Sequence, residues 1–408
     1  MERVPVEIWQ QILVKVMESN DVPIFATSCT PYTFLCFVDL HIRDDRDRVP
    51  YGDNLEQRKR LRPVCRAWNE FVLSTSHRWL RLEDTSEKHA LDLETVIRAK
   101  GGVGPVEKLS TKIYSRDLLM TLILPWVSHI LKRPASQSPL RTYILHLNTA
   151  PVQVYNPFDD LVGKTTTQNP DYTNTTLRSL SIVTSSTLSV LISLSQISRT
   201  FTGLHSLFLH EPKVLPQQTL SLAHLEVLYV YFSDLELETL QESMETWDTP
   251  ALRHVYLGRF SVPLTGVVDR FLGRYARQIE SLVLSQHKTH PLSLLDLPSG
   301  FWAQFTALRL LGVDYWTLER EEWSGWSIVP PPTHPCRYLV CRCQSRSVIF
   351  PSQMQSLVNA IRPRWTWHDG VRLVAGNRQR RSYWVMKNIQ DDPLDGDMEW
   401  NEGILPEL

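Results

Sequence analysis

The stretch LRSLSI at residues 177–182 contains a pattern that the chain then repeats: three apolar residues separated first by two residues and then by one. The other strong copies are LHSLFL at 204–209, LEVLYV at 225–230, LRHVYL at 252–257, IESLVL at 279–284 and LRLLGV at 308–313. Their first residues are 27, 21, 27, 27 and 29 positions apart. Such regular steps indicate a stacked repeat rather than coincidence.

Each copy alternates as a short β-strand does. Weaker copies place apolar residues at Leu80/Leu82, Val106/Leu109, Leu140/Tyr143/Leu145, Cys336/Leu339/Cys341 and Val371/Leu373. Segments between copies show helical spacing, and the clearest are Ser186–Phe201, Leu235–Trp247 and Val267–Ala276. A unit of strand, turn and helix, about 27 residues long, cannot bury its apolar face alone, so the units must stack.

The pattern resembles the irregular leucine-rich repeats, and the resemblance covers about residues 100–375. It implies an α/β fold, a solenoid of short parallel strands and helices. We expect the solenoid to span residues 83–375, and residues 376–408 to form a C-terminal cap and acidic tail. The alternative is a mixed α/β globule in which the pattern is fortuitous.

Two amphipathic segments precede the repeats. Residues 4–18 (VPVEIWQQILVKVME) and 58–72 (RKRLRPVCRAWNEFV) each place apolar side chains on one helical face and polar ones on the other. Because proline is tolerated only in a first turn, Pro63 predicts that the second helix begins near Arg62. So small a helical module carries more apolar surface than it can bury by itself.

These segments resemble an F-box, through VPVEIWQQIL at 4–13, VCRAW at 64–68 and WL at 79–80. The module would span residues 1–82, with an insertion at 19–57. In that family the motif docks on the Skp-type adaptor of the SCF (Skp–cullin–F-box) ubiquitin ligase. The resemblance implies adaptor binding by Pro5, Ile8, Trp9, Ile12, Leu13, Leu61, Val64, Cys65 and Trp68. Without it, the helices would be an ordinary N-terminal cap of the solenoid.

The resemblance implies a non-enzymatic substrate receptor in ubiquitin-dependent protein degradation, joined through the adaptor to a cullin–RING complex. In a leucine-rich solenoid, strand residues between the apolar positions face the concave surface and solvent. The predicted substrate-binding residues are therefore Phe208, His210, Tyr229, Tyr231, His254, Tyr256, Asp314, Tyr338 and Arg342. The alternatives are a leucine-rich-repeat interaction scaffold with a degenerate F-box, and a hydrolase with an α/β fold.

Composition narrows the class of protein further. The 408 residues are 42% hydrophobic and 21% charged, as in soluble globular proteins, and the formal net charge of −1 argues against broad binding to nucleic acid or membrane. No signal peptide or membrane-spanning stretch is found, and six scattered cysteines are too few for a disulfide framework. We expect an intracellular protein, cytoplasmic and/or nuclear, in which the sequon at Asn174 is unused.

Catalytic motifs are not found: the chain has no P-loop, no GxSxG elbow and no HExxH, and we expect no cofactor. His334, Cys336, Cys341 and Cys343 could ligate a metal. Because two of these cysteines occupy apolar repeat positions, we expect buried structural cysteines and no metal. The basic, aromatic stretch Arg362–Trp384 could stack single-stranded bases, or form a cap neutralised by the acidic tail.

Overall fold

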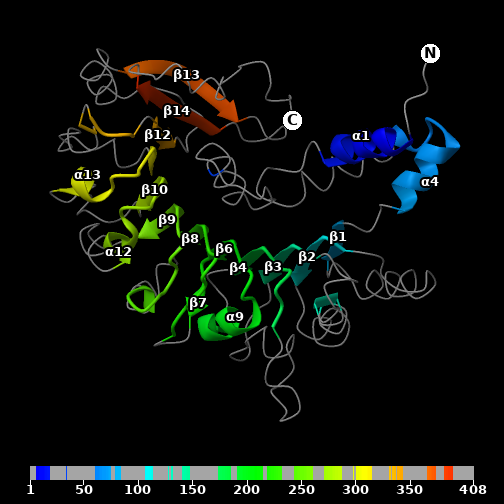
Figure 1. Cartoon of the computed structure of the whole chain (residues 1–408), viewed down its shortest axis with the longest axis horizontal. Coiled ribbons are helices and arrows are strands. Elements are labelled where there is room, and N and C mark those ends of the chain that lie inside the picture. Colours follow the sequence, from blue (N-terminus) through cyan, green and yellow to red (C-terminus); the bar gives the residue numbers. More distant parts are fainter. Residues whose placement is uncertain are drawn as a thin grey trace, which may run out of the picture. The chain divides into compact units, whose positions relative to one another are not determined.

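The structure is a computed structural model, and the chain divides into two compact units, Met1–Leu225 and Glu226–Leu408. This division falls inside the predicted repeat copy at 225–230, directly after its first apolar residue, and the predicted boundaries at 82/83 and 375/376 stay predictions. Both units are mixed α/β and are built on parallel strands (Figure 1). The structure describes residues 6–18, 34, 60–74, 79–83, 106–113, 127, 130–131, 140–147, 173–184, 191–214, 218–231, 243–260, 271–286, 297, 300–314, 330–331, 333–336, 338–342, 365–373 and 381–388.

In the first unit, five parallel strands pair in chain order. They are β1 (Trp79–Glu83), β2 (Lys108–Ile113), β3 (Thr142–Leu147), β4 (Ser179–Thr184) and β6 (Ser206–His210). The register places Tyr143 opposite Leu180, and Leu180 opposite Leu207. Equivalent apolar residues of the repeat therefore form one continuous column, as the spacing predicts.

In the second unit, the parallel strands are β8 (Val227–Tyr231), β9 (His254–Phe260), β10 (Ser281–Gln286), β11 (Leu310–Asp314) and β12 (Tyr338–Arg342). Two longer strands follow, β13 (Trp365–Leu373) and β14 (Arg381–Asn388), and β14 pairs antiparallel with both β12 and β13. Val371 and Leu373, which we predicted to be a further parallel repeat, thus belong to an antiparallel ladder. The parallel array ends at β12.

Several short helices and one longer one lie in the described part of the chain. They are α1 (Val6–Glu18), α4 (Arg66–Ser74), α9 (Leu194–Thr200), α12 (Gly273–Tyr275) and α13 (Phe301–Gln304). Among the helices that the structure describes, none has the length and apolar character needed to cross a bilayer. In the described part of the predicted helix Leu235–Trp247, which is residues 243–247, only residues 243–244 are helical.

The segment predicted as a helix over Ser186–Phe201 is part strand and part helix. Ser193 caps α9, because its hydroxyl accepts a hydrogen bond from the backbone N–H of Gln196 at 3.3 Å. Just before this cap, β5 (Leu191–Ile192) pairs in parallel with β7 (Lys213–Val214). The β-branched pair Ile192 and Val214 suits such a bridge, so tertiary pairing overrides the helical spacing there.

The repeat columns form the core of each unit. Leu180 and Leu207 in the first unit, and Leu228, Val255 and Leu282 in the second, are all 0% exposed. Burying each such side chain contributes about 1.5–3 kcal/mol of transfer free energy. The columns are therefore the main source of stability in the strand array.

The sequon residue Asn174 is part of this interior and is 6% exposed. Its amide nitrogen donates to the carbonyl of Leu131 at 3.1 Å, and its amide oxygen accepts from the backbone N–H of Leu177 at 2.9 Å. A glycan attached to this nitrogen would have to displace those contacts. The geometry therefore agrees with the expectation that the sequon is unused.

Candidate functional site

The predicted substrate-binding residues on the strands are far less accessible than we expected. Phe208, Tyr229, Tyr256, His254 and Tyr338 are all buried, and none is more than 5% exposed. The expectation that they face solvent is therefore wrong. Parallel strands are commonly covered on both faces, and the residues between the leucines pack here as the leucines themselves do.

The structure says less about the exposure of the other four predicted substrate-binding residues. His210 and Tyr231 are half-buried at the ends of β6 and β8. The side chains of Asp314 and Arg342 lie outside the described part of the chain. Substrate binding by the strand face thus stays a prediction, and the buried aromatic residues could contact a substrate only after the covering layer moved.

A stacked pair of tyrosines explains how the second face of the array is filled. The rings of Tyr229 and Tyr256 lie 4.3 Å apart, centroid to centroid, and are nearly parallel at 6°. Gly258 makes room beside them, because a Cβ at this position would lie 2.5 Å from the Tyr231 ring and 2.7 Å from the Tyr256 hydroxyl. Glycine is therefore a steric requirement at this point of β9.

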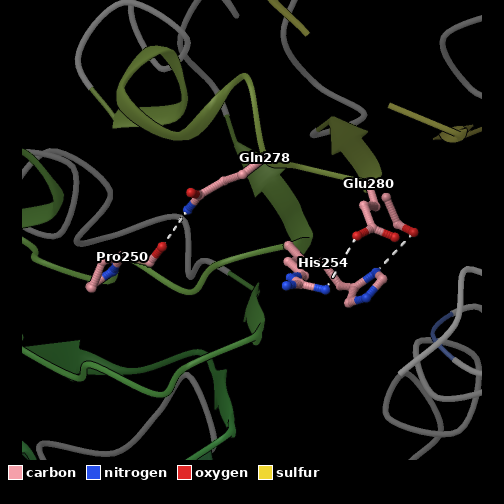
Figure 2. A network of polar contacts seen from close by, with 6 residues as sticks. Pro250, His254, Gln278 and Glu280 are labelled. Carbon is pink, nitrogen blue, oxygen red and sulfur yellow. Dashed lines mark hydrogen bonds and ion pairs between the residues drawn. The ribbon is translucent and has the colours of Figure 1, made fainter. Parts of the chain in front are cut away.

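Polar residues on the same face form a network that spans neighbouring repeats. The Nδ1 atom of His254 lies 3.0 Å from the Ser281 hydroxyl, and both residues are buried. A second contact between neighbouring repeats is shown in Figure 2, where the Gln278 amide donates to the carbonyl of Pro250 at 2.8 Å. A serine beside a histidine can serve nucleophilic catalysis, but Ser281 is 0% exposed, so a substrate could not reach its hydroxyl in this structure.

The candidate metal ligands fit structural roles. Cys336 is 0% exposed, and burial raises the pKa of its thiol to about 12. Both ring nitrogens of His334 are engaged: Nε2 lies 3.0 Å from the Phe305 carbonyl, and Nδ1 accepts from the Cys336 N–H at 3.1 Å. Within the described residues, no group of three or more potential ligands forms a metal site. Cys343 and the side chain of Cys341 lie outside that part.

The N-terminal helices differ from the strands because their apolar residues are exposed. Five large hydrophobic residues reach solvent there, with exposed fractions of 42–65%. They account for all the large exposed hydrophobic residues in the described part of the chain. We call them the apolar strip, which consists of Val6, Ile8, Trp9, Ile12 and Val64.

A contact between two tryptophans links the two helices that carry this strip. The ring centroids of Trp9 on α1 and Trp68 on α4 lie 6.0 Å apart, with the planes tilted by 48°. Leu13, one turn beyond Trp9, is only 2% exposed. Leu13 is thus packed, whereas Ile8, Trp9 and Ile12 on the same helix are exposed.

The predicted adaptor-binding residues fall into three groups. Ile8, Trp9, Ile12, Val64 and Cys65 are exposed. Leu61 and Trp68 are half-buried, whereas Leu13 is buried and Pro5 lies outside the described residues. The sequence reasoning missed Val6, which is 65% exposed. Its spacing of three residues from Trp9 could have placed it on the same helical face.

The turn before α4 explains the exposure of Val64. The predicted helix start near Arg62 is wrong, because residues 62–64 form a turn in which the N–H of Val64 donates to the Leu61 carbonyl at 3.2 Å. Helix α4 begins only at Arg66. Proline has no N–H to donate, and this turn accommodates Pro63 without loss of a helical hydrogen bond.

A shallow groove with a basic lining lies at the start of α4. The Arg62 Nε atom donates to the Asn69 side-chain oxygen at 2.9 Å, and Arg66 pairs with Glu70 at 2.8 Å. Both arginines are exposed. We call this feature the basic groove, which is lined by Arg62, Pro63, Cys65, Arg66 and Asn69.

Comparison of the chain with protein-family models, with curated proteins and with solved structures gave no match. The strongest candidate for a functional site is therefore identified by geometry alone. It is the surface of α1 and residues 60–69, which consists of the apolar strip and the basic groove.

Proposed function

We propose that this protein is the substrate-recognition subunit of an SCF-type ubiquitin ligase, and that its N-terminal helices dock on the Skp-type adaptor. The observation that carries the proposal is the apolar strip. Large hydrophobic side chains that gather on one surface mark an interaction site, whereas isolated ones do not. Four of its five residues were predicted to bind the adaptor from the F-box resemblance, namely Ile8, Trp9, Ile12 and Val64.

The composition of the surface supports docking of a protein. Protein interfaces have an apolar centre, enriched in aromatic residues and arginine, and a polar margin. Trp9 is 42% exposed and would be the central anchor, with Ile8 and Ile12 beside it. Burial of each such side chain on binding contributes about 1.5–3 kcal/mol before the entropy cost of association.

The strand arrays would hold the protein substrate in this proposal. The receptor brings the substrate close to a ubiquitin-conjugating enzyme carried by the cullin–RING complex, and it contributes no reacting group. Catalysis then arises from raised effective concentration. Within each unit, hydrogen-bonded parallel strands suit this role, because they would hold a bound segment in a defined geometry.

Co-purification with the adaptor tests the proposal. The wild-type chain should retain a recombinant Skp-type adaptor, and a Trp9→Ala/Ile12→Ala variant should bind it at least tenfold more weakly. A Gln10→Ala/Gln11→Ala variant is the matched control, because both glutamines are exposed on the same helix. Far-ultraviolet circular dichroism of all three proteins checks that α1 is intact.

Negligible adaptor retention by the wild-type chain, equal to that of the Trp9→Ala/Ile12→Ala variant, would reject the ligase function. The protein would then be an interaction scaffold whose N-terminal helices bind another partner. Equal, strong retention by all three proteins would instead place the adaptor elsewhere on the chain.

A further inference from the structure

One position of the repeat carries charge in nearly every copy: the residue just after the first apolar position. In the first unit this position is occupied by Glu107 and then by three basic residues, Arg141, Arg178 and His205. The backbone N–H of Arg178 donates to the Arg141 carbonyl at 2.7 Å, and that of His205 to the Arg178 carbonyl at 2.8 Å. The three residues therefore lie side by side, one strand spacing of about 4.8 Å apart.

The second unit carries alternating charges at the equivalent position, Glu226, Arg253, Glu280 and Arg309. The same backbone hydrogen bonds connect them, at 2.8–2.9 Å. Arg253 and Glu280 form an ion pair at 3.5 Å (Figure 2). Neighbouring residues of opposite sign stabilise one another, so this row is neutralised within the chain.

The basic residues of the first unit contact neutral groups instead. One guanidinium nitrogen of Arg178 donates to the Gly203 carbonyl at 3.1 Å and lies 3.4 Å from Nδ1 of His205. The His205 ring also stacks on His224, with centroids 5.9 Å apart and planes at 14°. Glu107 lies one strand before Arg141, whose N–H donates to the Glu107 carbonyl at 2.8 Å, but among the described residues no carboxylate forms an ion pair with Arg141 or Arg178.

We call these four residues the basic row: Arg141, Arg178, His205 and His224. Arg141, Arg178 and His224 are exposed, and His205 is half-exposed. Arg141 and Arg178 carry like charges on adjacent strands and repel each other, and an anion bound across them would remove that repulsion. The exposed arginines of the basic row therefore favour a negatively charged partner.

We propose that the basic row binds a carboxylate-rich segment of a protein. Arginine presents a planar fork that matches a carboxylate, and Arg178 is already oriented by its bond to Gly203. A protein segment is favoured over a nucleic acid because the row has only four residues in a chain of net charge −1. The inference rests on the proposed function only in identifying the segment as part of the substrate.

Fluorescence anisotropy with the full chain tests this proposal. The probe is a labelled twelve-residue peptide with six glutamates, and the matched peptide has six glutamines. An Arg141→Gln/Arg178→Gln variant should bind the glutamate peptide at least tenfold more weakly than the wild-type chain. An Arg253→Gln/Arg309→Gln variant, altered at the same repeat position of the second unit, should bind it as the wild-type chain does.

Three results would overturn the proposal. These are equal binding by the wild-type chain and the Arg141→Gln/Arg178→Gln variant, no binding by the wild-type chain at low salt, and competition by a twelve-nucleotide RNA at lower concentration than the unlabelled glutamate peptide. Thermal unfolding of the variants checks that the exposed substitutions leave the fold intact.

The peptide-binding experiment and the adaptor-retention experiment can fail independently of each other. The Arg141→Gln/Arg178→Gln variant should still retain the adaptor, and the Trp9→Ala/Ile12→Ala variant should still bind the peptide. Loss of both activities in one variant would indicate unfolding rather than the loss of a site.

Discussion

The N-terminal helices and the strand arrays use apolar residues in opposite ways. In the second unit, Tyr256 and Leu228 lie on the two faces of the strands, and both are 0% exposed. On α1, Trp9 and Ile12 are each 42% exposed. Apolar residues thus stabilise the strand arrays by being buried, whereas those on α1 remain exposed for association with a partner. Exposure, rather than hydrophobicity, separates the structural residues from the candidate binding residues.

Replacing one aromatic residue in each region should give the largest contrast. Tyr256→Ala removes a fully buried ring that stacks on Tyr229 and should lower the free energy of unfolding by about 3–5 kcal/mol. Trp9→Ala removes a partly exposed ring and should lower it by less than about 1 kcal/mol. Urea unfolding followed by circular dichroism measures both, and similar losses would contradict the comparison.

The two cysteines whose side chains the structure describes should differ in reactivity in the same way. Cys65 is exposed beside the apolar strip, whereas Cys336 is buried and has a thiol pKa of about 12. Because the thiolate is the nucleophile, iodoacetamide at pH 8 should alkylate Cys65 at least a hundredfold faster. Peptide mass spectrometry over time measures the two rates. Rapid modification of Cys336 in the folded protein would mean that the strand array opens readily.

The smallest effect should come from His334, which connects two repeats of the second unit. Partial burial lowers the pKa of its imidazole in the folded protein, and its backbone hydrogen bonds oppose this only in part. The unfolded chain therefore binds the proton first as the pH falls below about 6.5. The free energy of unfolding should decrease from pH 7.5 to pH 5.5. His334→Gln should weaken this pH dependence of the free energy of unfolding. An unchanged pH profile in the variant would show that His334 does not contribute to it.

Much of the strand arrangement could be predicted from the sequence. The apolar columns follow directly from the repeat, because parallel strands in register align equivalent positions, as Leu180 and Leu207 do. The charged position after the first apolar residue is also visible in the sequence. The sequence does not show which of these charged residues are neighbours. Only the strand pairing shows that Arg141 lies beside Arg178, and Arg253 beside Glu280.

The helices were less predictable, for physical reasons that can be named. Ile192 has helical spacing with its neighbours but pairs with Val214 instead, since a bridge to a distant segment outweighs a weak local preference. Similarly, the turn at Pro63 moves the start of α4 to Arg66 and exposes Val64. Local sequence patterns contain neither of these long-range or turn effects.

The sequence by itself determined the parallel strands, their apolar columns and the two amphipathic helices at the N-terminus, because periodicity is a local property of the chain. Only the tertiary structure decided which apolar side chains are buried. It buried three of the four predicted substrate-binding tyrosines, Tyr229, Tyr256 and Tyr338, and left Trp9 and Ile12 exposed. Burial depends on what covers a residue, and the covering groups come from parts of the chain that are distant in sequence.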